Sequence, residues 1–170
     1  MFESTCYLDS GCFLFAHRKR SDGIMITRLE ALYEDVEKAG ILYFNTDTTK
    51  ITAMTLRQDN EYAIAINERA YGSNAERLVT LAHEKGHCDT GAVYNLNTPL
   101  ITRGYCERRA NRWAVQNLMP LDELIGAFES GCANVFELAE FFEVTEDFMR
   151  FALELYEQDI KRIYQEKHGK

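Results

Sequence analysis

The chain has 170 residues, 46% of them hydrophobic, which suffices for one domain with a core and excludes two full-sized domains. Its formal net charge of -8 argues against a nucleic-acid-binding surface, because phosphate contacts need clustered lysine and arginine. The five cysteines are widely spread and form no C-x-x-C pair, and no apolar run approaches the length of about 18 residues that a membrane span needs. We therefore expect a reduced, cytoplasmic protein that binds neither nucleic acid nor membrane.

Residues 1–26 carry no clear pattern, and the first predicted element follows them. Thr27 and Glu30 form a capping box that opens an amphipathic helix, and Gly40 ends it. Residues 41–67 then contain three short β-rich runs, ILYF, KITAMTL and EYAIAIN, separated by the turn-like stretches NTDTTK and RQDN. This segment predicts a small, mostly antiparallel three-stranded sheet.

Two longer helices are predicted after the sheet. Ser73 and Glu76 form a second capping box, which opens a helix that runs through LVTLAHEKGHCD, residues 78–89. The next stretch, DTGAVYNLNTPLITR, is polar and typical of a loop. A further helix is predicted over about Gly104–Met119.

The C-terminal part is predicted to be helical. Pro120 suits the first turn of a short helix that ends near Gly131, and Asn134 and Thr145 can cap two more. The last two helices resemble a helix-turn-helix, but the stretch from Asn134 to residue 159 is rich in acids and has only Arg150 as a base. Packing on the preceding domain is therefore a better interpretation than DNA binding.

The HEKGH stretch has the spacing of a metal site. Residues four apart on a helix project from the same side, so the imidazoles of His83 and His87 can bind one ion. Glu84 is poorly placed to be a third ligand, but it can act as a general base on a water that the ion makes acidic. Gly86 costs about 1 kcal/mol in mid-helix relative to alanine, which a close approach by another element or a substrate would explain.

A third ligand has to come from a carboxylate or a thiolate elsewhere. In the predicted helix 104–119, Glu107 shares the apolar side with Ala110, Ala114 and Leu118, where a carboxylate needs a cation. Asn111 lies one turn further along that face and can hydrogen-bond a ligand histidine. A salt bridge to a nearby arginine is the alternative for Glu107, and a plain surface amide is the alternative for Asn111. Cys106 and Cys88 are weaker candidates for the third ligand, because such cysteines more often lie in the core.

Two tyrosines flank the ligand helices. Tyr94 and Tyr105 could each stabilise the oxyanion of a tetrahedral intermediate, and the sequence does not choose between them or exclude a structural role for both.

The stretch LAHEKGH, followed by CERRANRWAVQNLMP, resembles the ImmA/IrrE family of metallo-endopeptidases over about residues 25–158. The resemblance implies an α+β, zincin-like (minimal gluzincin) domain over residues 27–119, with a small antiparallel sheet, and a helical segment over residues 120–170 packed on it. It implies one Zn²⁺ per chain on His83, His87 and Glu107, with Glu84 as the catalytic base and Asn111 beside the ligands. Arg109 stands where many relatives carry a second acid.

The resemblance also implies a substrate. Members of the family typically cleave a helix-turn-helix transcriptional repressor of a phage or mobile element, and we expect such a protein as the partner. The run EYAIAIN, just before the HEKGH helix, is a candidate sheet edge for an extended substrate. The alternative function is a metal-containing binding module that sequesters a repressor or other partner without cutting it. Mn²⁺ or Fe²⁺ could replace zinc in a site of two histidines and a carboxylate.

Overall fold

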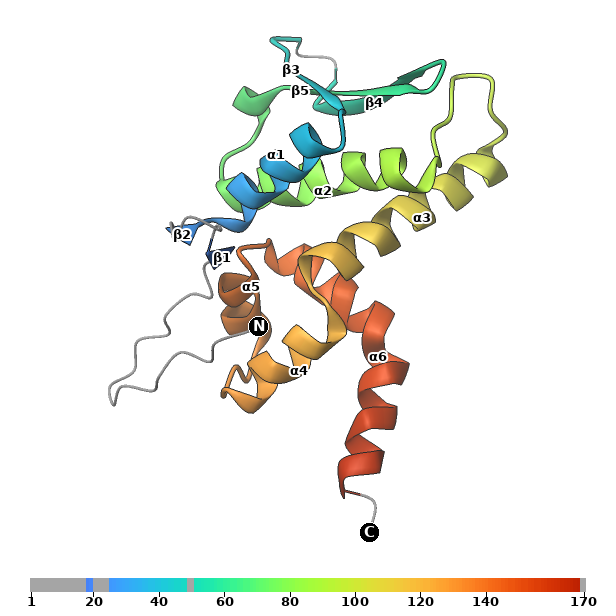
Figure 1. The fold of residues 1–170 in the computed structure, drawn as a ribbon. Helices are drawn as coiled ribbons and strands as arrows, with labels where there is room; N and C mark the ends of the chain where they lie inside the picture. Colours follow the sequence, from blue (N-terminus) through green and yellow to red (C-terminus); the bar gives the residue numbers. More distant parts are fainter. Residues whose placement is uncertain (1–17, 20–24, 49–50, 169–170) are drawn as a thin grey trace.

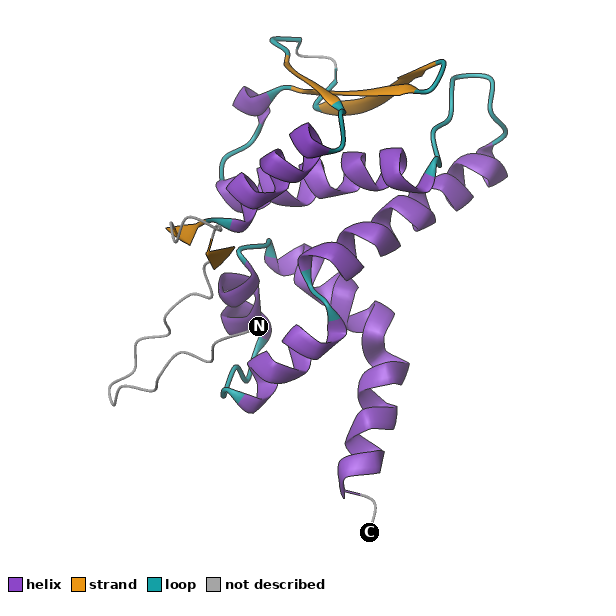
Figure 2. Cartoon of the chain, viewed as in Figure 1, coloured by secondary structure: helices purple, strands orange, loops and turns teal. Residues whose placement is uncertain are grey.

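The computed structural model describes residues 18–19, 25–48 and 51–168 (Figure 1). The predicted N-terminal segment, residues 1–26, lies mostly outside this range, and its described part is a short antiparallel pair of β1 (Arg18–Lys19) and β2 (Met25–Ile26). The fold is α+β, with the larger sheet at one end and helices through the rest of the molecule (Figure 2). Among the described residues, no helix is both long enough and apolar enough to cross a membrane.

Capping explains where the first two long helices begin. Thr27 caps α1 (Arg28–Lys38) through the predicted reciprocal box with Glu30. Ser73 caps α2 (Asn74–Thr90) by accepting a hydrogen bond from the backbone N–H of Glu76. Both predicted helices are confirmed. The third helix, α3 (Leu100–Leu118), begins four residues earlier than predicted, directly after Pro99, which shortens the preceding loop.

The larger sheet is mixed, which corrects the prediction of a mostly antiparallel one. Its strands are β3 (Leu42–Asn45), β4 (Ala53–Gln58) and β5 (Glu61–Ile66), in the order β3-β5-β4. A tight hairpin through Asp59, which has φ 53°, makes β4 and β5 antiparallel. The chain between β3 and β4 passes the position that β5 later takes, so β5 lies between them and runs parallel to β3.

This strand order also corrects the predicted substrate edge. β5, which contains most of EYAIAIN, is the central strand, so its backbone groups already pair with a strand on each side. An extended peptide can add only to a strand with an unpaired side. The edge strands of this sheet are β3 and β4.

One face of the sheet packs on the helices and the other faces away from them. Strand β5 lies above α1 and α2 (Figure 1), and its Ile64 and Ile66 are fully buried. On the opposite face, Leu42, Phe44 and Leu56 are each about half exposed. A short 3₁₀ helix (Glu68–Ala70) then leads from the sheet to α2.

The C-terminal part consists of α4 (Leu121–Glu129), α5 (Val135–Phe142) and α6 (Glu146–His168). All three helices were predicted, and Asn134 and Thr145 cap α5 and α6 as expected. One buried cluster includes residues of these helices together with those of α1, α2 and the sheet. The far end of α6 projects away from the other elements (Figure 1).

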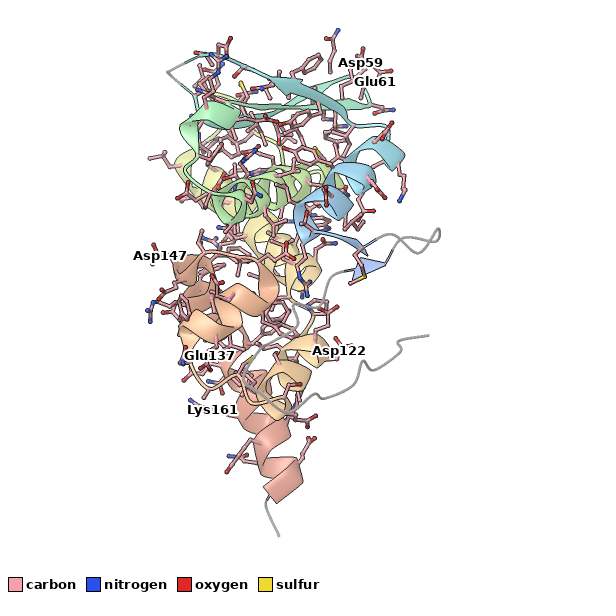
Figure 3. The ribbon with its side chains drawn as sticks, turned by 90° about the vertical axis from the view of Figure 1, so that its left-hand side faces the viewer. Asp59, Glu61, Asp122, Glu137, Asp147 and Lys161 are labelled. Atoms are coloured by element: carbon pink, nitrogen blue, oxygen red, sulfur yellow. The ribbon has the colours of Figure 1, made fainter. Side chains whose placement is uncertain are left out.

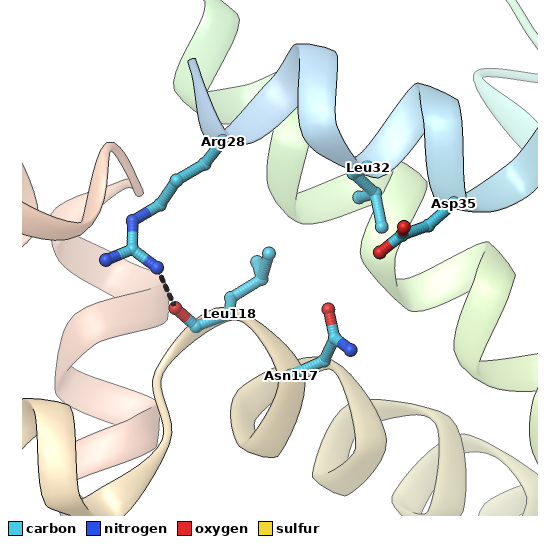
Figure 4. A pocket seen from close by; sticks show the side chains of 5 residues that line it. All are labelled: Arg28, Leu32, Asp35, Asn117 and Leu118. Atoms are coloured by element: carbon cyan, nitrogen blue, oxygen red, sulfur yellow. Dashed lines mark hydrogen bonds between the residues drawn. The ribbon is translucent and has the colours of Figure 1, made fainter. Parts of the chain in front are cut away.

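Arg28 joins the first helix to the C-terminal part. Its buried guanidinium donates to the Leu118 carbonyl at 3.0 Å (Figure 4) and to the Glu123 carboxylate at 2.9 Å, and it lies over the Phe142 ring. The backbone N–H of Arg28 also donates to Glu143. These contacts connect α1 with the end of α3 and with α4 and α5, so we refer to them as the Arg28 junction.

Candidate metal centre

The centre lies where α2 and α3 cross. The HEKGH residues occupy the second half of α2, and α3 packs against them at Gly86. A Cβ atom added to Gly86 would lie 2.7 Å from the Ala110 carbonyl oxygen, which is closer than real Cβ contacts. The close approach that Gly86 predicts is therefore confirmed, and the approaching element is α3. Glycine here allows the two helices to bring their polar side chains together.

Three predicted side chains converge at this crossing. His83 Nε2 lies 3.1 Å from His87 Nε2 and 3.2 Å from a carboxylate oxygen of Glu107, and His87 Nε2 lies 3.4 Å from the other oxygen. Among the described residues these three form a group that could hold a metal ion, with all ligand atoms within 4.8 Å of one another. His87 is buried, while the side chains of His83 and Glu107 are 23% and 36% exposed, so the group opens to solvent on one side.

The other ring nitrogen of each histidine fixes the orientation of the ring. His87 Nδ1 lies 2.7 Å from the carbonyl oxygen of Ala92, which can only accept, so Nδ1 donates. His83 Nδ1 likewise lies 2.7 Å from Asn111 Oδ1. In a neutral imidazole with its proton on Nδ1, Nε2 presents a lone pair, and the two Nε2 atoms here face each other and the carboxylate of Glu107. Acceptors at such distances repel unless a proton or a cation lies between them.

The spacing of the three groups fits a metal ion. Nitrogen and oxygen ligands held tetrahedrally at zinc distances lie about 3.3–3.4 Å apart. The three separations here are 3.1, 3.2 and 3.4 Å, already close to that value. Two neutral imidazoles and one carboxylate also make the donor set of known catalytic zinc sites, which leave a position open for water or substrate. The same donor set accepts other divalent metals.

Glu84 is buried beside the group without joining it, as the sequence predicts. Its side chain turns toward the sheet, where the hydroxyl of Thr55 lies 2.6 Å from the carboxylate and 3.0 Å from the Glu84 carbonyl. Since a hydroxyl has one proton, Thr55 donates to one of these oxygens at a time. This contact fixes Glu84 between α2 and β4 and leaves its second carboxylate oxygen for other partners.

The structure separates the two tyrosines that the sequence leaves equal. Tyr94 lies at the centre, with its ring 6.0 Å from that of His87 and its hydroxyl hydrogen-bonded to Glu107. This hydrogen bond, followed by desolvation, raises the pKa of Tyr94 to about 12, so the hydroxyl keeps its proton at neutral pH. Tyr105 is 60% exposed and stacks under Arg108 instead.

Of the other residues considered from the sequence, Asn111 lies at the centre and the two cysteines do not belong to the ligand group. Asn111 contacts His83 as expected, through the hydrogen bond given above. Cys88 is buried in the core, and burial raises the pKa of its thiol to about 11. Neither Cys88 nor Cys106 belongs to the metal-binding group found among the described residues. Arg109 donates to the Thr90 carbonyl at the end of α2, 2.7 Å away, and so helps to fix the crossing of the two helices.

Two contacts at the centre were missed by sequence reasoning. One is the contact of Thr55 with Glu84. The sequence does contain a signal for the position of Thr55, because the two-residue loop after Gln58 places it opposite the buried Ile64, on the inner face of the sheet. The other is the carbonyl of Ala92, which depends on the left-handed conformation of Gly91 at the end of α2. A carbonyl direction of this kind has no signature in side-chain patterns.

Comparison with known proteins adds one match. The family model described as the IrrE N-terminal-like domain, Peptidase_M78, matches residues 33–154, well over half of the chain. The matched stretch begins within α1 and ends within α6, so it contains the sheet and both helices of the metal centre. No curated protein and no solved structure matches the chain.

Proposed function

The chain belongs to the Peptidase_M78 family of IrrE N-terminal-like domains, and from this premise we propose that it is a zinc-dependent endopeptidase. Membership in this family suggests a metallopeptidase, as the sequence resemblance implies. The observation that carries the proposal is the convergence of two imidazole lone pairs and a carboxylate, with the buried acid Glu84 next to them. A purely structural zinc site takes four protein ligands and has no use for such a base.

The proposed roles follow from the contacts of each side chain. His83, His87 and Glu107 would hold the ion, which would polarise the scissile carbonyl and lower the pKa of water. Glu84 takes a proton from the water as the water attacks the scissile carbonyl carbon. It then passes this proton to the amide nitrogen, which leaves as an amine when the C–N bond breaks. Thr55 holds the Glu84 carboxylate in place. Tyr94, protonated at neutral pH, donates a hydrogen bond to the oxygen on which negative charge develops.

We assign the substrate edge to β4. This strand is an edge of the sheet, it packs along α2, and its Thr55 contacts Glu84, so a peptide added to it would pass the centre. Backbone hydrogen bonds to β4 would hold the substrate extended.

For the substrate itself we keep the expectation that the resemblance supports, a helix-turn-helix repressor of a phage or mobile element cut in an exposed segment. The alternative is a binding module that sequesters such a partner uncut. The acidic chain, with its net charge of -8, suits contact with a basic DNA-binding protein in either case.

A single substitution separates the two functions. Glu84→Gln keeps the shape of the side chain and the acceptor for Thr55, but it cannot take up a proton. We expect this variant to fold and to bind metal like wild type, and to leave a disordered protein such as casein, and any repressor encoded beside the gene, uncut. Mass spectrometry of the products is the measurement. Cleavage by Glu84→Gln at the wild-type rate would contradict the proposal, and repressor binding without cleavage by wild type would favour the binding module.

A further inference from the structure

An exposed apolar surface adjoins the metal centre. It is formed by Leu96 in the loop between α2 and α3 and by three residues at the start of α3: Leu100, Ile101 and Tyr105. Their exposed fractions are 91%, 81%, 76% and 60%. We call these four residues the loop surface. Burying such apolar side chains is favourable, so the exposure of four of them within residues 96–105 points to an interaction.

The loop that carries Leu96 is held in shape. Arg103 donates to the carbonyls of Leu96 and Thr98, and Asn95 accepts hydrogen bonds from the backbone N–H groups of Asn97 and Thr98. A network of hydrogen bonds therefore holds the backbone on which Leu96 stands. Because the loop backbone is already held, binding a partner there orders little of it.

The loop surface is continuous with the metal centre through two side chains. The guanidinium of Arg103 lies over the ring of Tyr94, 5.7 Å from its centroid. Tyr94 in turn contacts His87 and Glu107. The loop stands at the same end of the sheet as the β4–β5 hairpin (Figure 1), so a peptide extended along β4 would have this loop ahead of it.

The charge around the loop surface differs from that of the chain as a whole. Helix α3 has four arginines and a single acid, Glu107, whereas the whole chain has 27 acidic and 19 basic residues. Arg108 is exposed next to the loop surface, stacked on Tyr105. Within the described part of the chain it makes no ion pair with a carboxylate. An acidic residue of a partner would be attracted here.

We propose that the loop surface selects the substrate by binding a bulky aliphatic side chain in a segment that also carries an acidic residue, next to the bond presented at the metal centre. This inference rests on the proposed peptidase function, which it extends to a class of cleavage site. A second copy of the chain is a poorer occupant, because a two-fold contact would bring each Arg108 toward its own equivalent. A lipid surface is poorer as well, since it would not explain the connection through Tyr94 to the centre.

The test measures binding separately from cleavage. Fluorescein-labelled twelve-residue peptides of glycine and serine carry one Leu-Asp pair, one Ser-Asp pair or one Leu-Asn pair, and their affinity for the metal-loaded Glu84→Gln protein is followed by anisotropy. We expect the Leu-Asp peptide to bind about tenfold more tightly than the Ser-Asp peptide, the size of effect that an apolar contact of this kind has on selectivity. The Leu-Asn peptide should bind more weakly than the Leu-Asp peptide, and the difference should shrink as salt is raised.

Variants locate the effect. Leu96→Ser and Ile101→Ser, each combined with Glu84→Gln, should remove the preference for leucine. The matched control is Leu42→Ser, also combined with Glu84→Gln. It replaces an exposed leucine of β3 away from the metal centre, and this variant should keep the preference for leucine. An unchanged preference in Leu96→Ser and Ile101→Ser would overturn the inference.

Two further outcomes would also overturn it. One is that Leu96→Ser dissociates a dimer in gel filtration. The other is that Leu96→Ser abolishes binding to vesicles of phosphatidylcholine and phosphatidylserine. In both cases the preference for the Leu-Asp peptide would stay unchanged. Failure of the proposed function is recognised separately: wild type would then leave casein and every peptide uncut, whatever the binding results.

Discussion

The Arg28 junction and the metal centre both gather polar side chains at a meeting of distant elements, but they balance their hydrogen bonds differently. At the junction two donors of the Arg28 guanidinium meet acceptors, the Leu118 carbonyl and the Glu123 carboxylate, and only its buried Nε has no hydrogen-bond partner within the described part of the chain. At the centre two ring nitrogens and a carboxylate, all acceptors, face one another within about hydrogen-bond distance.

The difference shows what each cluster is for. A cluster in which donors meet acceptors holds distant elements together, and its removal costs stability. A cluster in which acceptors converge needs a proton or a cation between them, and the tetrahedral spacing of this one fits a metal ion. The junction is thus a structural contact, whereas the centre is a group that could hold a metal ion.

The largest expected effect is the loss of activity on replacing Glu84, which separates a catalytic from a structural role of this residue. Glu84→Gln should lower the rate of peptide cleavage by about 10²–10⁴-fold, the usual contribution of a general base, with little change in the thermal midpoint of unfolding. The control is Glu61→Gln at the tip of the β4–β5 hairpin (Figure 3), an exposed acid away from the crossing of α2 and α3. Equal loss of activity in both variants would mean that Glu84 has no special role.

A second prediction concerns the junction. Arg28→Met keeps much of the side-chain volume but leaves the Leu118 carbonyl without its donor, so we expect a loss of about 2–3 kcal/mol in the free energy of unfolding. Metal content should stay at the wild-type level. Arg150→Met removes an exposed pair with Glu146 and should cost less than about 1 kcal/mol. Urea denaturation of the three proteins measures the difference, and loss of metal in folded Arg28→Met would erase the distinction between the two clusters.

A third prediction concerns the support of a ligand. Asn111→Ala removes the acceptor that orients His83, and we expect metal affinity to fall about 10–100-fold in a competition titration with a chelator. Asn111→Asp keeps an acceptor at this position and should stay close to wild type. If the Asn111→Ala and Asn111→Asp proteins bind metal equally well, the hydrogen bond to His83 does not contribute to metal affinity.

The smallest effect compares two glycines inside helices. At Gly86 a Cβ would push against the Ala110 carbonyl, a cost of about 1–3 kcal/mol that the better helix propensity of alanine offsets by about 1 kcal/mol. At Gly126 in α4 nothing lies within 4 Å of an added Cβ, so Gly126→Ala should stabilise the fold by up to about 1 kcal/mol. Gly126→Ala should therefore raise the thermal midpoint, whereas Gly86→Ala, with a net cost of up to about 2 kcal/mol, should leave it unchanged or lower it. A stabilising Gly86→Ala would show that α3 can move away from α2 without cost.

The features that the sequence predicted correctly are local or depend on one helix. The capping boxes of Thr27 and Ser73 gave the starts of α1 and α2, and the shared face of α3 placed Glu107 toward the histidines. The mostly antiparallel sheet and the edge position of EYAIAIN were wrong, because alternation within a run shows which residues share a face and not which strand is its neighbour. The hairpin register places Thr55 on the inner face of the sheet, but its contact with Glu84 and the choice of Tyr94 depend on how β4 and the α2–α3 loop lie over α2, which only the folded chain determines.

The most direct test of the central claim is the metal content of the purified protein, measured by mass spectrometry for wild type and for Glu107→Ala, with circular dichroism to establish that both are folded. We predict about one zinc per wild-type chain and its loss in a folded Glu107→Ala, because that variant removes the carboxylate that lies 3.2 and 3.4 Å from the two histidines. A folded wild type that contains no metal and takes up none when zinc, manganese or iron is added would contradict the claim that these acceptors converge on a cation.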